Sequence, residues 1–336
     1  YVGTKPNGLA NPDLKWEESE QTDIGLDLGF FNNALTFTAD YFYKKTNGML
    51  KTMPIPSYVG DSKPTGNVGD MENKGLEFEL GYKFRAGDWN FRIGANASYI
   101  KNKLINLGNE SGFEMSDYIV GGLANVTRAE NGYVYPFFYG RVTDGIFQNW
   151  DEINSYIHTN EDGTTSLIQP NAVPGDVRFK DLNGDGKIDN DNDKTIIGKG
   201  MPDWTYGLNF QASWKNIDFS MVIVGAVGND IFDATRRCDI SEFNLPKWIW
   251  EHRWTGEGTS NTMPRFTIKD PNESWSSASD LYIKDGDYLR LKNIQLGYTL
   301  PRNLTKKVFI ENLRVYVAAE NLLTFTKYDG FDPEIA

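Results

Sequence analysis

The sequence has little of the side-chain chemistry on which most enzymes and disulfide-rich domains depend. Its 336 residues include one cysteine, Cys238, and two histidines, His158 and His252. One cysteine excludes an internal disulfide, and neither histidine has a metal-ligand spacing to another histidine or to the cysteine. The Gly-x-Ser-x-Gly elbow of hydrolases and the phosphate-binding Gly-rich loop are also missing. We therefore expect that the chain is not an enzyme, and we assign no catalytic residue.

Long apolar runs and an excess of positive charge are missing as well. Stretches such as Met221–Val224 fall far short of the about 18 apolar residues that a membrane-spanning helix needs. Lys and Arg number 34 against 46 Asp and Glu, a net charge of −12, whereas nucleic-acid-binding domains usually carry a basic face. These absences exclude a helical membrane protein and argue against a nucleic-acid partner. They do not exclude a membrane β-barrel, because polar residues alternate with apolar ones along its strands.

What the sequence does contain is alternation of apolar and polar residues with a period of two. Leu76, Phe78 and Leu80, for example, alternate with Glu77 and Glu79. This period is typical of a β-strand that has one apolar and one polar face. It predicts eight strands, over residues 23–31, 34–45, 69–84, 88–103, 203–215, 217–228, 287–300 and 312–325.

The length of these strands separates a membrane barrel from an ordinary soluble sheet. The runs extend over roughly 10–16 residues, whereas strands average about 5–6 and a tilted strand crosses a bilayer in about 9–11. Aromatic residues such as Phe30, Trp89 and Trp214 gather near strand ends, as in the interfacial girdles of outer-membrane barrels. We therefore expect an all-β fold, an antiparallel transmembrane β-barrel in contact with outer-membrane lipid. Its interior would be lined by the polar faces, with Asp23, Asp27, Glu77, Glu79, Arg92, Asn96, Asn209 and Gln211.

The connections between the predicted strands alternate between short and long. Short turns are expected around Asn32-Asn33, Ala86-Gly87, Asn216 and residues 301–311. The long connections are 46–68, 104–202 and 229–286. Outer-membrane barrels have short periplasmic turns and long extracellular loops, so we expect all three long segments on the outer side. A strand-like piece, 137–147, lies inside the second, and if it crosses the membrane a second crossing must accompany it.

One acidic motif has the spacing of a calcium-binding loop. It runs from Asp181 to Asp193 and places oxygen-bearing groups at alternate positions around a glycine turn, as a hard cation requires. The position that normally holds a bidentate acid is Asn192, with Asp191 before it and Asp193 after it, so the closing ligand is either displaced or absent. We expect calcium to bind here, and the alternative is an acidic turn in a solvated loop. The candidate ligands are Asp181, Asn183, Asp185, Lys187 through its backbone carbonyl, Asp189 and Asp193.

A second motif is rich in aromatic rings. Three tryptophans lie within residues 248–254, and an indole can stack on a sugar ring and also donate a hydrogen bond. Trp250 and Trp254 are the ligand-contact candidates. The alternative, which the size of the loops favours, is that these rings pack loop against loop over the barrel mouth.

Seven strings spread in order over the chain resemble the SusC/RagA family, which are TonB-dependent outer-membrane transporters of Bacteroidetes-type bacteria. They are NPDLKWEES (11–19), NKGLEFELGY (73–82), YGRVTDGIFQN (139–149), PGDVRFKDLNGDGKID (174–189), RWTGEGTSNTMPR (253–265), DYLRLKNIQLGYTLP (287–301) and VYVAAENLLTFTKYDGFDPE (315–334). The resemblance implies a plugged barrel of about 22 strands in the Gram-negative outer membrane. Residues 1–336 would be a C-terminal barrel part, with the plug domain and N-terminal region absent from the sequence. The resemblance also implies a SusD-like surface lipoprotein and the TonB system as partners.

We therefore expect TonB-dependent import of nutrients, with oligosaccharides or peptides as cargo. Two rivals stay open at this point. One is a soluble, calcium-dependent, carbohydrate-binding β-sandwich that uses the tryptophan-rich loop. The other is a membrane-barrel hydrolase that uses His252 with a nearby serine.

Overall fold

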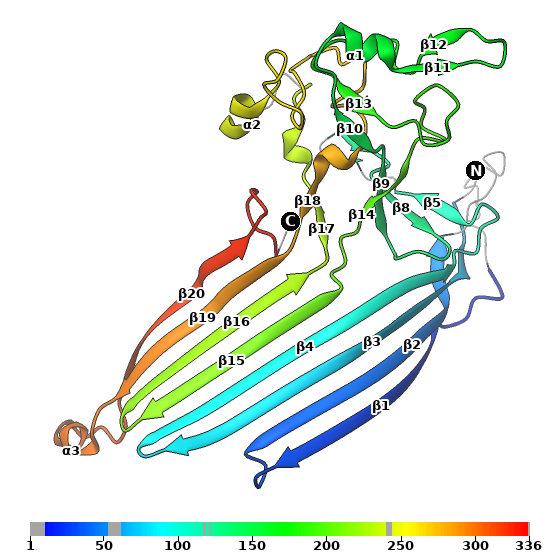
Figure 1. Ribbon diagram of the computed structural model, residues 1–336. Helices are drawn as coiled ribbons and strands as arrows, with labels where there is room; N and C mark the ends of the chain where they lie inside the picture. Colours follow the sequence, from blue (N-terminus) through cyan, green and yellow to red (C-terminus); the bar gives the residue numbers. More distant parts are fainter. Residues whose placement is uncertain (1–10, 53–61, 117–118, 121, 240–243, 335–336) are drawn as a thin grey trace, which may run out of the picture.

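The structure is a computed structural model that describes residues 11–52, 62–116, 119–120, 122–239 and 244–334. Eight long strands form one antiparallel sheet in the order β1-β2-β3-β4-β15-β16-β19-β20. Figure 1 shows this sheet as a single curved layer, with the tight turns at its lower end and the long loops at its upper end. The strands are β1 (Glu18–Phe30), β2 (Leu35–Thr52), β3 (Thr65–Ala86), β4 (Trp89–Asn106), β15 (Trp204–Trp214), β16 (Ile217–Val227), β19 (Tyr288–Thr299) and β20 (Arg314–Thr326).

All eight predicted strands are therefore confirmed, and the largest errors lie at their loop-side ends. Strands β2 and β3 continue pairing to Thr52 and Thr65, so the connection predicted as 46–68 is much shorter. The extension includes two register shifts, one between Thr46 and Met49, and Gly48 there has a φ of +62°. A bulge interrupts the period of two, and for this reason alternation alone did not reveal the outer part of the hairpin.

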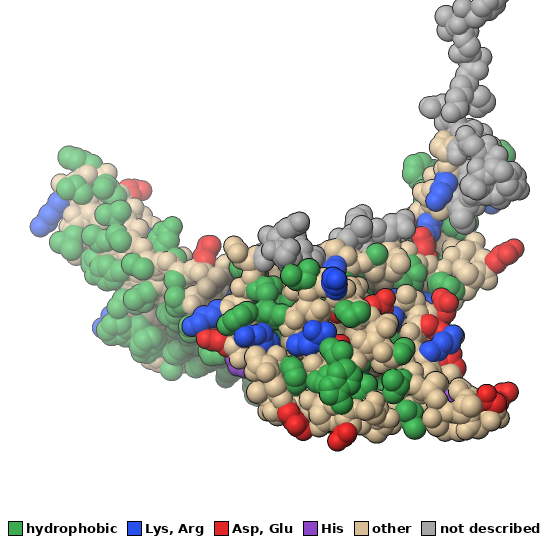
Figure 2. Space-filling model, turned by 90° about the horizontal axis from the view of Figure 1, so that it is seen from above, with side chains coloured by type: hydrophobic (Ala, Val, Ile, Leu, Met, Phe, Trp, Pro, Cys, Tyr) green, Lys and Arg blue, Asp and Glu red, His purple; other side chains and the backbone are tan. Residues whose placement is uncertain are grey.

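The strand register gives the sheet one apolar and one polar face. Leu208 lies opposite Ala95 on one side and Ile223 on the other, so these apolar side chains share a face. Glu79 lies opposite Thr38 and Asn96 on the polar face. Figure 2 shows hydrophobic side chains covering the receding part of the molecule at the left. Among the described residues the long strands make a single layer, so the two-sheet β-sandwich expected by one rival is wrong.

The long connections fold into an assembly of short elements at the upper end of the sheet, called here the outer loop assembly (residues 107–203 and 228–287) (Figure 1). Its strands are β5 (Phe113–Met115), β6 (Ile119–Val120), β7 (Leu123–Ala124), β8 (Thr127–Glu130), β9 (Phe137–Gly140), β10 (Thr143–Ile146), β11 (Ile157–Thr159), β12 (Thr165–Leu167), β13 (Val177–Phe179), β14 (Thr195–Gly198), β17 (Asp230–Phe232) and β18 (Ile283–Asp285). Its helical elements are α1 (Trp150–Ser155), η2 (Ala234–Arg236), α2 (Lys247–His252) and η3 (Asp280–Tyr282). Two further short elements, α3 (Arg302–Thr305) and η4 (Lys306–Val308), lie at the opposite end of the sheet.

The strand-like piece 137–147 belongs to this assembly. It forms β9, which pairs with β14 and β8, and β10, which pairs with β13. Neither strand joins the eight-stranded sheet. Among the described residues, no helix combines the length and the apolar character that crossing a membrane requires.

Candidate functional site

The acidic loop is held in shape by its own carboxylates. The two carboxylate oxygens of Asp181 accept hydrogen bonds from the backbone N–H groups of Gly184 at 2.7 Å and Gly186 at 2.8 Å. Gly186 has a φ of +87°, and a Cβ added there would lie 2.4 Å from the ring of His158. Glycine is therefore required at this position both for the backbone conformation and for space.

The far end of the loop is closed by Asp193. Its carboxylate is fully buried and accepts hydrogen bonds from the backbone N–H of Leu182 at 2.8 Å and of Asp189 at 2.7 Å. These bonds join the two ends of the loop across about ten residues of chain. Asp193 therefore closes the loop through hydrogen bonds to the backbone, and its role as a cation ligand stays a prediction.

A lysine ammonium lies beside two of the candidate ligands. Lys187 Nζ is 2.9 Å from a carboxylate oxygen of Asp189 and 3.7 Å from one of Asp185. The hydrogen bond from Lys187, helped by the backbone N–H of Asn192, lowers the pKa of Asp189 to about 2. The same Asp189 hydrogen bond raises the pKa of Lys187. Within the described ranges, no group of three or more His, Cys, Asp or Glu side chains is arranged to hold a metal ion.

The candidate ligands thus lie in one loop, but the side-chain geometry does not by itself make a cation cage. The carboxylates of Asp181 and Asp193 bind backbone N–H groups, and the ammonium of Lys187 neutralises Asp189. The loop supplies oxygen ligands, the type that a hard cation prefers, and it has a glycine with positive φ at the turn, as the calcium-loop motif requires. Calcium binding stays a prediction.

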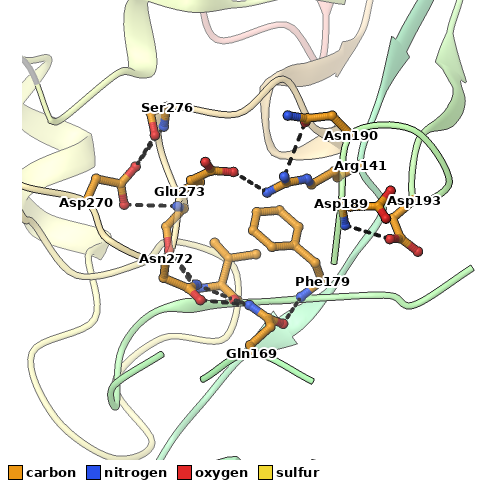
Figure 3. Close-up of polar contacts among 12 residues, drawn as sticks. Arg141, Gln169, Phe179, Asp189, Asn190, Asp193, Asp270, Asn272, Glu273 and Ser276 are labelled. Carbon is orange, nitrogen blue, oxygen red and sulfur yellow. Dashed lines mark hydrogen bonds and ion pairs between the residues drawn. The ribbon is translucent and has the colours of Figure 1, made fainter. Parts of the chain in front are cut away.

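Arg141 connects the acidic loop to the segment 270–276 (Figure 3). Its guanidinium lies 2.8 Å from Glu273 and donates to the side-chain oxygen of Asn190 at 3.3 Å. It also lies over the ring of Phe179, 5.2 Å from the centroid, and Arg141 is only 4% exposed. A cavity of about 330 Å³ opens beside these groups, and its lining combines the charged Arg141, Asp189 and Glu273 with several amide and apolar side chains. The contacts fix the position of the acidic loop relative to the rest of the assembly.

Buried side chains fix the 270–276 segment in the same region (Figure 3). The amide of Gln169 donates to Asn272 Oδ1 at 2.9 Å, and its oxygen accepts from the Phe179 N–H at 2.8 Å. The buried carboxylate of Asp270 accepts from the N–H groups of residues 274, 275 and 276, at 2.8–2.9 Å. These residues were missed by sequence analysis. The Asp-Pro-Asn turn signal at 270–272 was the one local clue.

A buried ion pair supports the same region from the other side. Asp176 is fully buried and lies 2.7 Å from Arg265. Burial raises the pKa of Asp176, although the hydrogen bond from Arg265 opposes that rise. The pair joins residues almost ninety positions apart in the chain.

The two ligand-contact tryptophans have different surroundings. Trp254 donates its indole N–H to Gln148 Oε1 at 3.2 Å and packs on Gly175, where an added Cβ would lie 2.5 Å from the ring. Trp250, on α2, is 56% exposed, and the guanidinium of Arg253 lies 3.4 Å from its ring centroid. Trp254 is therefore part of loop packing, whereas Trp250 is more than half exposed although Arg253 and Phe266 pack against its ring.

His252, the proposed base of the alternative hydrolase interpretation, contacts the backbone, and the lone cysteine, Cys238, packs in an apolar cluster. His252 Nδ1 lies 2.7 Å from the backbone oxygen of Trp248. Cys238 is buried in a cluster with Ile249, Met263 and Trp275. Nothing in these contacts points to a nucleophile and its base.

Comparison with known proteins places this geometry in a family. Residues 1–322 match the family model described as TonB dependent receptor-like, beta-barrel. The chain is 32% identical over 328 residues to TonB-dependent receptor P3 of Formosa agariphila, which covers 97% of the chain and 31% of that protein. It is 28% identical over 344 residues to TonB-dependent receptor SusC of Bacteroides thetaiotaomicron, covering all of the chain and 31% of SusC.

A solved structure of the RagAB peptide transporter matches as well. The TM-score is 0.75 at 28% identity, over 98% of this chain and 34% of that one. The chain thus spans about a third of the length of the relatives it matches. The two curated relatives are named TonB-dependent receptors, and the solved structure is that of a peptide transporter. The apolar face of the long strands is accordingly the lipid face of a barrel wall in the outer membrane. The chain belongs to the TonB-dependent receptor-like β-barrel family, in its SusC/RagA branch.

Proposed function

We propose that this chain forms part of the wall and the extracellular loops of a TonB-dependent importer for oligosaccharides or peptides, with a SusD-like lipoprotein at its outer face. The observation that supports this most strongly is the likeness to the RagAB peptide transporter over 98% of the chain, outer loops included. The polar face of the sheet, with Asn96, Asn209 and Gln211, lines the passage. The outer loop assembly contacts the lipoprotein and the cargo.

The direct experiment uses the full-length transporter extracted from its native outer membrane in mild detergent. An affinity tag on the transporter should recover an abundant surface lipoprotein, identified by mass spectrometry, in near-stoichiometric amount. Uptake of that lipoprotein's ligand by whole cells should stop when the proton gradient is collapsed. Recovery of the transporter alone, together with uptake that needs no proton gradient, would contradict the proposal.

We propose further that calcium binds the acidic loop. The supporting observation is the fully buried Asp193 carboxylate, which closes the loop with backbone bonds and has no ion pair among the described residues. Calcium would be held by Asp181, Asn183, Asp185, the Lys187 carbonyl, Asp189 and Asp193. It would displace the Lys187 ammonium, because both compete for the same two carboxylates.

Isothermal titration of the full transporter with calcium tests this. We expect binding in the micromolar-to-millimolar range, lost in Asp181→Asn and strengthened in Lys187→Ala. Asp162→Asn is the matched control, because Asp162 caps a nearby turn through Thr164 and lies outside the loop. No calcium-dependent heat at millimolar calcium, in either the native protein or Lys187→Ala, would contradict the assignment.

We also propose that Trp250 contacts the cargo or the lipoprotein, because its ring is exposed while Trp254 is packed. Trp250→Ala should weaken cargo uptake severalfold and leave the resistance of the loops to protease unchanged. Trp254→Ala should instead lower the resistance of the loops to protease before it affects uptake. The change leaves a gap against Gly175 and removes the hydrogen bond to Gln148. Equal uptake in Trp250→Ala and the native protein would contradict this role.

A further inference from the structure

One of the four short connections at the lower end of the sheet differs from the other three. Three of them, residues 31–34, 87–88 and 215–216, are tight turns. The fourth, residues 300–313 between β19 and β20, contains α3 and η4 and projects beyond the strand ends (Figure 1). It is called here the basal segment. Two neighbouring antiparallel strands can be joined by a turn of two residues, so the extra length of the basal segment is not needed for the connection.

The basal segment exposes several large apolar side chains. Phe309 is 98% exposed, Val308 is 62% exposed and Leu304 is 55% exposed. Phe309 has a φ of +62°, and its N–H donates to the Lys306 carbonyl at 3.2 Å, so the backbone is fixed with the ring turned outward. A left-handed conformation is unfavourable for a phenylalanine. In water, neither the exposed apolar side chains nor this backbone conformation brings a benefit.

The segment is continuous with the lipid face of the wall. The Leu300 N–H donates to the Leu313 carbonyl at 2.9 Å, which carries the strand pairing into the segment. The register then places Val315 opposite Tyr298, on the face that bears the apolar side chains. At the same end of the sheet, Trp89 stacks with Trp214 at 5.9 Å between ring centroids, as in an interfacial aromatic girdle. The segment therefore begins at the level where acyl chains give way to headgroups.

The charges of the segment are mainly positive. The segment contains three basic residues, Arg302, Lys306 and Lys307, and one acidic residue, Glu311. The carboxylate of Glu311 lies 3.2 Å from the guanidinium of Arg302. Within the part of the chain that the structure describes, Lys306 and Lys307 take part in no ion pair. Exposed apolar side chains next to unpaired lysines are the arrangement by which interfacial segments bind anionic lipid surfaces. A protein partner would need acidic groups placed opposite these lysines. Anionic lipid headgroups supply such negative charge along the whole rim of the barrel.

We propose that the basal segment binds anionic phospholipid in the periplasmic leaflet of the outer membrane. Leu304, Val308 and Phe309 enter the boundary between headgroups and acyl chains. Lys306 and Lys307 extend along that boundary and bind the phosphate groups. This inference rests on the family assignment of the wall and is independent of the cargo and of the lipoprotein partner.

The first test measures the depth of Phe309. A cysteine-free full transporter carrying Phe309→Cys is labelled with an environment-sensitive fluorophore and placed in nanodiscs that contain doxyl-labelled lipid. Phe331→Cys is the matched control, because Phe331 is equally exposed and follows the end of β20 that lies away from the basal segment. We expect strong quenching by doxyl lipid at position 309 and weak quenching at position 331. Quenching equally weak at both positions would overturn the proposal, and protection of position 309 from aqueous iodide without doxyl quenching would assign the surface to protein.

The second test measures the charge preference. Native mass spectrometry counts the phosphatidylglycerol or cardiolipin molecules retained by the transporter from mixed-lipid nanodiscs. Lys306→Glu with Lys307→Glu should lower the affinity for anionic lipid by about fivefold per lysine. Lys247→Glu, a change at an exposed lysine on α2 of the outer loop assembly, should leave it unchanged. Equal lipid retention in the two variants would overturn the assignment of the lysines.

Discussion

The long-stranded wall and the outer loop assembly gain their stability in different ways. The largest fully buried side chains of the chain, which include Trp275, Tyr282 and Phe147, lie almost entirely in the assembly. In the wall, the side chains of Leu26, Leu80 and Leu296 are exposed, although they share the apolar face. The assembly contains small cores of its own, whereas the wall is one layer that needs lipid on one face. Exposed apolar side chains therefore mark a lipid-facing surface in the wall, whereas in the assembly they lie outside its small cores.

Polar side chains differ between the regions in the same manner. On the wall they line one face and bond mostly to near neighbours across a strand pair, as Thr38 does to Asp27. In the assembly they are buried and join distant segments, as Gln169 does to Asn272. A charge introduced into the wall should therefore be tolerated on the polar face and not on the apolar face. Removal of a buried polar side chain from the assembly should destabilise the assembly and leave the barrel wall intact.

The largest expected effect sharpens this comparison within a single strand. Leu208→Arg places a charge on the lipid face in the middle of β15, where it costs about 2–4 kcal/mol, so we expect assembly of the barrel to fail. Gln211→Arg, on the polar face of the same strand, should assemble normally. Heat-modifiable mobility of the full transporter in outer-membrane fractions measures both. Equal yields of the two variants would contradict the assignment of the faces.

A smaller effect is expected from Asp270→Ala in the assembly. The change leaves three backbone N–H groups without their acceptor, which we expect to destabilise the assembly by about 1–3 kcal/mol. Protease cleavage within residues 265–280 should increase, while the heat-modifiable mobility of the barrel stays as in the native protein. Asp162→Ala, at an exposed turn cap, serves as the control. Loss of the barrel in Asp270→Ala would show that the two regions do not behave independently.

The smallest effect concerns acid. The folded loop holds the pKa of Asp189 at about 2, below its ordinary value of 3.8, so its contribution to loop stability is complete above about 3.8 and is lost as the pH falls toward 2. Pepsin cleavage of the 181–193 loop, expressed relative to its cleavage of an unstructured peptide of the same sequence at the same pH, should be faster at pH 2 than at pH 4. Asp189→Asn removes the titrating group and should abolish most of that difference. A native loop cut equally at both values would contradict the assignment.

The two regions also differ in how far the sequence predicted them. The eight wall strands were predicted because alternation is a local signal, repeated over each strand and independent of the partner. Its failure at the β2–β3 hairpin has a local cause, the bulge next to Gly48. The assembly could not be predicted in this way, since its contacts join residues such as Gln169 and Asn272 that lie 103 positions apart. The motif of the acidic loop was found, but Arg141 and Asp270, which fix the surroundings of that loop, carry no local pattern.

The central claim is that β15 and its neighbours form a wall with lipid on the even-numbered face of β15 and the barrel interior on the other. Spin labels placed singly at positions 204–214 of the full transporter in lipid test it most directly. We expect an accessibility to oxygen that peaks at 204, 206, 208, 210, 212 and 214, and an accessibility to a water-soluble nickel complex that peaks at the odd positions between them. Two profiles that rise and fall together, or show no period of two, would contradict it.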